Sequence, residues 1–252
     1  MNSMKTRRTI RAYSDQIVEN SLLNELLTTA CRASNTGNMQ AYSIIETHDH
    51  NQKNALAPLH FNQPQITQAS VILTFCADFN RFGKWCSFRK ANPGYANLQA
   101  LTYSSIDTVI LAQAFCDAAE AKGLGICYLG TTTYNALQIC EVLKLPQLVL
   151  PIVTITVGYP MSTAEPLTNR LPLDGIVHHE RYRDYTQEDI DRIYAETEAL
   201  PENKHFLEFN NKETLAQIFT DIRYTKKDNE YFSKTFLNAV RQQGFHINED
   251  VK

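Results

Sequence analysis

The stretch of sequence that decides the fold passes from a long apolar segment into a short strand: SSIDTVILAQAFCDAAEAKGLGICYLG, residues 104–130. Residues 104–122 place apolar side chains on more than one face of a helix, which predicts a helix buried on all sides. Gly123 suits the position just beyond the last helical turn, where a left-handed backbone is common. The apolar residues 126–129 that follow predict a short strand.

Outward from this segment, strands alternate with helices along the first part of the chain. Apolar residues recur at helical spacing over 19–32 and 134–143, and continuous apolar runs predict strands over 42–45, 71–77 and 152–158. Residues 82–99 are expected to form an irregular, aromatic-bearing excursion. This alternation predicts an α+β or α/β sheet domain that ends at about residue 160.

The rest of the chain has a different character. Residues 187–252 are more charged and are predicted to be helical. Two apolar stripes recur there at helical spacing: Leu215, Ile218, Phe219 and Ile222, and then Phe232, Phe236 and Val240. These stripes could close onto their own domain or onto a second subunit.

Composition excludes several classes of protein. The net charge is −3, with 24 basic and 27 acidic residues, which argues against binding nucleic acid by phosphate neutralisation. The longest apolar runs, 71–75 and 148–158, are shorter than the roughly 18 residues of a membrane helix. No apolar segment follows the basic N-terminus, so a secretory signal is not expected and the cytosol is the expected compartment. None of the six cysteines has C-x-x-C spacing, which predicts free, buried thiols.

The densest polar motif is RRTIR, residues 7–11. Three guanidiniums and a hydroxyl ahead of a helix suit a phosphate group, because arginine donates two parallel hydrogen bonds to phosphate oxygens. The alternative is a solvated basic tail. The apolar Ile10 between these charges favours an ordered segment.

Two further segments could contact a ligand. The amide-rich loop 34–40 could hydrogen-bond the edge of a heteroaromatic ring, or could be an ordinary turn. Gly130 and Thr131, between a strand and a helix, could bring backbone amides close to a ligand, or Thr131 could simply help cap the helix. The glycines of residues 123–130 precede the strand and lack G-x-G-x-x-G spacing, so they do not form a dinucleotide fingerprint. The sequence His178-His179-Glu180 is better explained as a solvated loop than as a metal site.

The order of these motifs resembles that of the nitroreductase family of FMN-dependent NAD(P)H oxidoreductases. The resemblance rests on RRTIRAY (7–13), SNTGNMQ (34–40), HFNQPQITQASVILTFCADFNR (60–81), GLGICYLG (123–130), LKLP (143–146) and LPIVTITVGYP (150–160). The sequence LTNRLP (167–172) and the helical tail are most similar to the longer branch of NADPH-flavin oxidoreductases and oxygen-insensitive nitroreductases. Arg7 stands where that branch often has histidine, and Thr131 where it often has a second glycine.

The resemblance implies an α+β fold with a central, mainly antiparallel sheet flanked by helices, and an intertwined homodimer. It implies an FMN-binding domain over residues 1–182 and a helical extension over 183–252 that packs on the domain or on the partner subunit. The flavin-binding residues that it implies are Arg7, Arg8, Thr9, Arg11, Asn35, Asn38, Gln40, Gln63, Tyr128, Leu129, Gly130, Thr131 and Arg170.

The implied chemistry belongs to FMN, with no catalytic side chain and no metal. NADPH or NADH would deliver electrons, and nitroaromatics, quinones or flavins would receive them in a ping-pong cycle. The competing interpretation is a flavin-binding protein with a regulatory or storage role and little turnover. A nucleic-acid module that uses the N-terminal arginines is disfavoured by the acidic pI of about 6.2.

Overall fold

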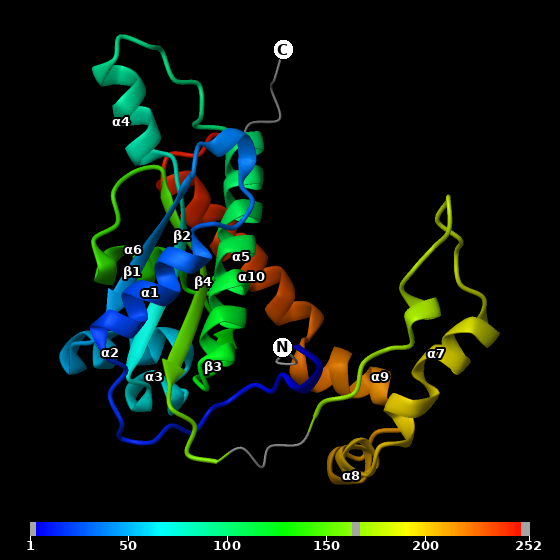
Figure 1. Cartoon of the computed structure of the whole chain (residues 1–252). Coiled ribbons are helices and arrows are strands. Elements are labelled where there is room, and N and C mark those ends of the chain that lie inside the picture. The colour runs from blue at the N-terminus through cyan, green and yellow to red at the C-terminus, as the bar shows by residue number, and fades with distance from the viewer. Residues whose placement is uncertain (1–3, 163–166, 248–252) are drawn as a thin grey trace. The chain divides into compact units, whose positions relative to one another are not determined.

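The computed structural model describes residues 4–162 and 167–247 (Figure 1). Its internal contacts divide the chain into two units, one containing residues 4–162 and 232–247 and the other residues 167–231. The expected boundary between residues 182 and 183 falls inside the second of these units. Contacts within that unit join the two sides of this position: Arg192 pairs with Asp174 at 2.5 Å, and the hydroxyl of Tyr185 donates to the carbonyl of Gly175 at 2.9 Å.

The first unit contains an antiparallel sheet with strand order β1-β2-β4-β3. The strands are β1 (Tyr42–Thr47), β2 (Val71–Asp78), β3 (Gly125–Leu129) and β4 (Val149–Gly158). All eight residues of β2 are buried, as its continuous apolar sequence predicts for a central strand. The expected antiparallel sheet is confirmed, and β1 and β3 form its two edges.

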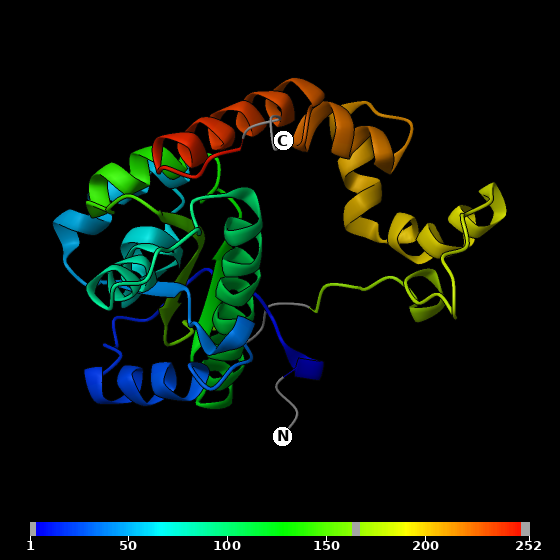
Figure 2. The ribbon, with the colours of Figure 1, turned by 90° about the horizontal axis from the view of Figure 1, so that it is seen from above.

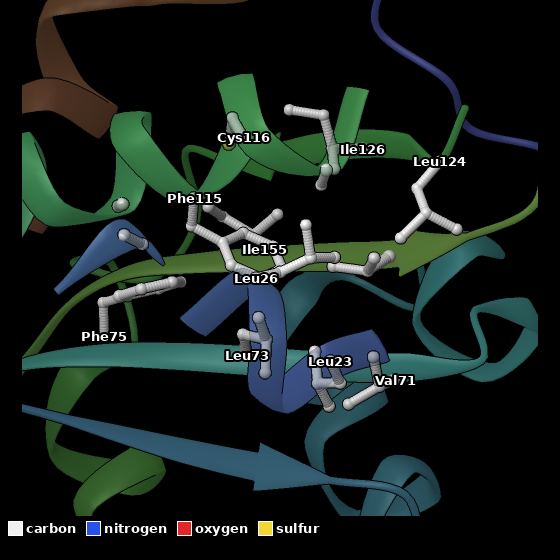
Figure 3. Packing of buried hydrophobic residues seen from close by; sticks show 14 of the residues in the cluster. Leu23, Leu26, Val71, Leu73, Phe75, Phe115, Cys116, Leu124, Ile126 and Ile155 are labelled. Carbon is white, nitrogen blue, oxygen red and sulfur yellow. The ribbon is translucent and has the colours of Figure 1, made fainter. Parts of the chain in front are cut away.

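Helices cover both faces of the sheet. The helices of this unit are α1 (Asn20–Ala30), α2 (His50–Leu56), α3 (Gln65–Gln68), α4 (Asn80–Phe88), α5 (Leu98–Ala121) and α6 (Ala136–Leu143), with the short turns η1 (Met4–Thr6), η2 (Thr36–Asn38) and η3 (Ala57–His60). Figure 3 shows α1 and α5 contributing Leu23, Leu26 and Phe115 to the layer that also holds Val71, Leu73 and Phe75 of β2. Ile72 points to the opposite face, where it packs in a cluster with residues of η3, α3 and α6.

Helix α5 is longer and more exposed than its sequence predicts. It begins at Leu98, before the expected residue 104, because the side chain of Asn97 accepts a hydrogen bond from the backbone N–H of Ala100. It ends before Gly123, whose φ of +80° confirms the predicted left-handed position. The prediction of burial on all sides is wrong for the single chain, because Ile106, Val109 and Ile110 are 53%, 43% and 40% exposed.

The N-terminal segment is an ordered part of the sheet unit. The backbone N–H of Ile10 donates to the carbonyl of Ile126 on β3 at 3.0 Å. Gly125 permits this approach, since a Cβ at that position would lie 2.7 Å from the Cβ of Ile10. The hydroxyl of Tyr13 contacts Thr156 Oγ1 of β4 at 2.7 Å. The arginine-rich segment is therefore held along the β3 edge.

The excursion between β2 and α5 contains a helix that the sequence did not predict. Helix α4 begins next to Asp78, whose carboxylate accepts from the backbone N–H of Arg81 at 3.1 Å. The aromatic residues expected there do gather, with the rings of Phe79 and Tyr95 stacked at 4.9 Å between centroids.

The second unit and the C-terminal helix confirm the predicted helical tail. The elements are η4 (Leu173–Gly175), α7 (Gln187–Ala199), α8 (Pro201–Asn210), α9 (Leu215–Gln217), a π-helical turn η5 (Ile218–Arg223) and α10 (Lys226–Gln242). Residues 232–247 belong to the sheet unit, and Figure 2 shows the red C-terminal part of α10 beside the helices of that unit. Ala239, Val240 and Phe245 pack there with Leu150. No helix in the described ranges is long and apolar enough to cross a membrane. All six cysteines are free, and Cys31 differs from the prediction because it is exposed.

Candidate functional site

The predicted phosphate-binding segment borders a pocket of about 190 Å³ at the β3 edge. The residues that line this pocket are Thr6, Arg7, Arg8, Ile10, Glu120, Gly123, Leu124 and Pro160. Arg8 and Thr9 are half-buried, and Arg11 is exposed. The fold therefore holds several cationic groups beside one another on an ordered surface, which is the arrangement that an anionic ligand requires.

Arg7 has a partner that the sequence did not indicate. Its Nε lies 3.5 Å from Oε1 of Glu120, near the end of α5. Burial raises the pKa of Glu120 from the usual 4.5 to about 7, and the Arg7 guanidinium opposes that rise. The second carboxylate oxygen, Oε2, is buried without a hydrogen-bond partner among the described residues. Arg7 is thus paired with a carboxyl that burial keeps partly protonated near neutral pH.

Arg11 and Gln63 are both linked to Cys127 of β3, Arg11 by its charge and Gln63 through Gln65. Burial raises the pKa of the Cys127 thiol on β3, and the nearby Arg11 guanidinium lowers it. The amide nitrogen of Gln65 lies 3.9 Å from the Cys127 sulfur and donates to Oε1 of Gln63 at 2.8 Å. These contacts bring two predicted flavin residues, far apart in sequence, to one strand.

The end of β3 and the turn after it contain the remaining predicted residues of this edge. Tyr128 packs against the cluster on the α5 face, and Leu129 is buried in the cluster on the opposite face. Gly130 is exposed, and a Cβ built there would have no atom within 4 Å. The hydroxyl of Thr131 lies 2.8 Å from Nδ1 of the buried His60. The backbone of this turn is open to a ligand at Gly130 and anchored at Thr131.

The amide-rich loop is held at a different place. The backbone N–H and hydroxyl of Thr36 donate to the Asp107 carboxylate of α5 at 2.9 and 3.0 Å. Asn35 Oδ1 accepts from the backbone N–H of Gln40 at 3.2 Å, and the Gln40 side chain donates to Asn38 at 3.3 Å. A guanidinium nitrogen of Arg81 donates to the carbonyl of Gln40. This loop therefore presents its polar groups from a rigid turn.

The predicted residues thus form two groups in the sheet unit. The β3 group contains Arg7, Arg8, Thr9, Arg11, Gln63 and residues 128–131, and the loop group contains Asn35, Asn38 and Gln40. The two groups contact α5 through Glu120 and Asp107, which are 13 positions apart along the helix. At a rise of 1.5 Å per residue, this separates the two contacts by about 20 Å.

Arg170 belongs to the second unit. Its Nη1 donates to the hydroxyl of Thr168 at 2.6 Å and to the carbonyl of Asn169 at 2.9 Å. A larger pocket of about 540 Å³ in that unit is lined by residues between Leu173 and Tyr185 and contains none of the predicted flavin residues. The described residues include no group of three or more side chains that could hold a metal ion.

Several supporting residues were missed by the sequence analysis. Asp107, Glu120, Arg81 and His60 each contact a predicted site residue or its loop. These residues are far from their partners in the sequence, so no pattern among neighbouring residues indicates the contacts. A polar or charged residue inside an otherwise apolar helix, as at Asp107, is the one signal that was available.

A family model, related sequences and solved structures are similar to this chain. The model of the nitroreductase family matches residues 4–159. A protein named FMN reductase (NADPH) from Bacillus subtilis is 32% identical, covering 100% of this chain and 96% of the relative. An oxygen-insensitive NADPH nitroreductase from Salmonella typhimurium is 34% identical over 70% of this chain and 71% of its own. The crystal structure of a putative oxidoreductase from Bacteroides fragilis is 55% identical, with a TM-score of 0.95 over 97% of this chain and 99% of that one.

The buried carboxyl of Glu120 gives a pH-dependent prediction. The pKa of Glu120 in the folded protein, about 7, exceeds the usual 4.5. Ionisation of this carboxyl should therefore lower the free energy of unfolding of the wild type as the pH rises from about 4.5 to 7. Glu120→Gln cannot ionise, so its free energy of unfolding relative to wild type should be about 1–3 kcal/mol higher at pH 8 than at pH 5. Urea unfolding at the two pH values measures this difference.

Glu25→Gln is the matched control, because Glu25 is 58% exposed and pairs with Lys122 at the surface. Its relative stability should change little between the two pH values. An equal response of the two variants would contradict the assignment of a raised pKa to Glu120.

Proposed function

The chain belongs to the nitroreductase family, and we propose that it is an FMN-dependent oxidoreductase that passes electrons from NAD(P)H to nitroaromatics, quinones or flavins. The observation that carries this proposal is the β3 group. Guanidiniums, a side-chain amide and an open backbone turn gather there from segments separated by more than 100 residues.

The donors of the β3 group fit FMN. A terminal phosphate requires several cationic donors, which Arg8 and Arg11 provide. A flavin ring presents both donors and acceptors along its polar edge, and the amide of Gln63 can satisfy either. The space beside Gly130 suits the close approach of a planar ring. A dinucleotide cofactor would favour a glycine fingerprint for its pyrophosphate, and the glycines at 123–130 do not have G-x-G-x-x-G spacing.

The roles of the protein follow from these contacts. Bound FMN supplies the transfer of electrons between the two substrates. Arg8 and Arg11 bind its phosphate, to which the family resemblance also assigns Arg170, while Gln63 and residues 128–131 orient the ring. Because burial raises the pKa of Glu120, its carboxyl offsets less of the Arg7 charge near the phosphate than an ordinary glutamate would. No side chain has to act as a nucleophile, because the cofactor carries the electrons. The nicotinamide and the acceptor use one open face of the ring in turn.

We further propose that the active form is a homodimer. The β3 group and the loop group contact α5 about 20 Å apart, so one chain does not bring both to a single ring. Helix α5 also exposes an apolar stripe, which consists of Ile106, Val109 and Ile110. A second copy packed on this stripe would cover it and bring its loop group toward the β3 group of the first.

The direct test is the spectrum of the purified protein. We expect a yellow protein that releases FMN and not FAD on denaturation, and whose flavin absorbance is bleached anaerobically by NADPH or NADH. Initial rates with a quinone or nitroaromatic acceptor should give parallel double-reciprocal lines, because both substrates use one site in turn. A colourless protein that does not bind added FMN would refute the proposal, and tight FMN binding without turnover would support a storage role.

The homodimer is tested by placing a charge in the α5 stripe. Ile110→Lys should shift the protein toward monomer and weaken FMN binding at least tenfold, because an ammonium group cannot be buried there without a partner. Ile17→Lys is the control, since Ile17 is 69% exposed and lies outside α5. Sedimentation velocity reports the oligomeric state; a wild-type monomer that holds FMN would rule out the shared site.

The phosphate ligands are tested by removing two arginines. Each hydrogen bond to a charged phosphate is worth about 1.5–3 kcal/mol, so Arg11→Ala with Arg170→Ala should weaken FMN binding by about 10²–10⁴ if the effects add. Riboflavin, which lacks the phosphate, should show a smaller loss. Fluorescence titration of the apo-protein measures both affinities. Arg181→Ala is the charge-matched control, and unchanged FMN binding by the double variant would show that these arginines are not phosphate ligands.

A further inference from the structure

A buried histidine links two segments of the β3 group. His60 ends η3 and is 0% exposed. Its Nδ1 lies 2.8 Å from the hydroxyl oxygen of Thr131, and its Nε2 is buried without a hydrogen-bond partner among the described residues. The chain thus keeps an imidazole in the core with one polar contact, to a residue of the turn that follows β3.

The surroundings of His60 decide where its proton lies. An N–H at Nε2 would be a buried donor with no acceptor. We expect an unprotonated nitrogen at that position to cost less free energy on burial than an unpaired N–H. We therefore assign the proton to Nδ1, so that Nδ1 donates to Thr131 Oγ1. Burial also lowers the pKa of His60 to about 4, so the ring is neutral at ordinary pH. With its oxygen accepting from His60, the Thr131 hydroxyl hydrogen is left for another acceptor.

The backbone after His60 leads directly to Gln63. Phe61 and Asn62 both adopt left-handed conformations, with φ of +56° and +53°, which residues other than glycine seldom do. The N–H of Asn62 donates to the carbonyl of Ala57 at 2.8 Å, and that of Gln63 to the carbonyl of His60 at 3.3 Å. The histidine therefore joins a tightly defined turn carrying Gln63 to the turn carrying Thr131.

We propose that His60 and Thr131 form a positioning pair in which His60 orients the Thr131 hydroxyl as a hydrogen-bond donor to the flavin ring. This inference rests on the proposed FMN site. Thr131 is placed to reach the ring, because it is half-buried and directly follows the open backbone at Gly130. A donor aimed at the ring stabilises its electron-rich, reduced form more than its oxidised form. The pair would therefore favour reduction of the cofactor by NAD(P)H.

The test compares the affinities of apo-protein for oxidised and reduced FMN. A neutral hydrogen bond contributes about 0.5–1.5 kcal/mol, so Thr131→Val should raise the Kd for reduced FMN about 2- to 12-fold and raise the Kd for oxidised FMN less. Thr131→Ser, which keeps the hydroxyl, should restore the wild-type ratio of the two Kd values. Anaerobic fluorescence titration with FMN and with dithionite-reduced FMN gives that ratio without any turnover.

The role of His60 is tested in the same titrations. His60→Leu should reproduce the effect of Thr131→Val, and the two changes together should be no worse than either alone, because they remove the same interaction. His60→Asn retains a side-chain N–H near the position of Nδ1. It should therefore give a ratio of the two Kd values between those of His60→Leu and the wild type. If His60→Leu does not fold, the comparison of Thr131→Val with Thr131→Ser still decides the proposal.

Thr132→Val is the structural control, because the Thr132 hydroxyl is buried and donates to the carbonyl of Leu129 at 3.0 Å. It should lower stability without changing the ratio of the two Kd values. A wild-type ratio in Thr131→Val, or an equal loss for both forms of FMN, would overturn the role of the hydroxyl while leaving the proposed function intact. Absence of FMN binding by the wild type would instead refute the proposed function.

Discussion

Burial of β2 on both faces is the constraint on which the rest of the structure depends. Every residue of this strand is enclosed, by α1 and α5 on one side and by η3, α3 and α6 on the other. Because the hydrophobic contribution scales with the apolar area removed from water, a strand of this composition favours the centre of the sheet. The less apolar β1 and the short β3 then become the edges. The segment that carries the predicted phosphate ligands lies along β3, where the backbone N–H of Ile10 donates to the carbonyl of Ile126.

Helix α5 joins the core to the proposed site. Its inner side supplies Leu111, Phe115 and Cys116 to the core, and its outer stripe is exposed in the single chain. Two acidic side chains on this helix hold the two groups of predicted flavin residues, Asp107 through Thr36 and Glu120 through Arg7. A rigid helix that sets both contacts also sets the distance between them. This separation is the reason for our proposal that a second copy of the chain completes the site.

Desolvation controls the charge of the titratable groups near β3. Burial disfavours the ionised form of both Glu120 and His60, which raises the first pKa to about 7 and lowers the second to about 4. The surface beside the arginines therefore carries less negative charge than its composition implies, and the histidine remains a neutral hydrogen-bond donor. Both effects suit an anionic cofactor whose ring takes up electrons.

Local patterns in the sequence determined the strands of the sheet unit and the order of its motifs, but not helix α4 or the return of residues 232–247 to that unit. The apolar run over 71–77, the helix ending before Gly123 and the arginines around Ile10 each depend on neighbours in the chain, so composition and spacing were sufficient. The start of α5 was missed because a single cap, at Asn97, outweighed the weaker pattern ahead of residue 104. Tertiary structure alone decided the pairs Thr36 with Asp107, Arg7 with Glu120 and His60 with Thr131. Their partners are at least 71 positions apart, and only the packing of helices on the sheet brings such residues within hydrogen-bonding or ion-pair distance.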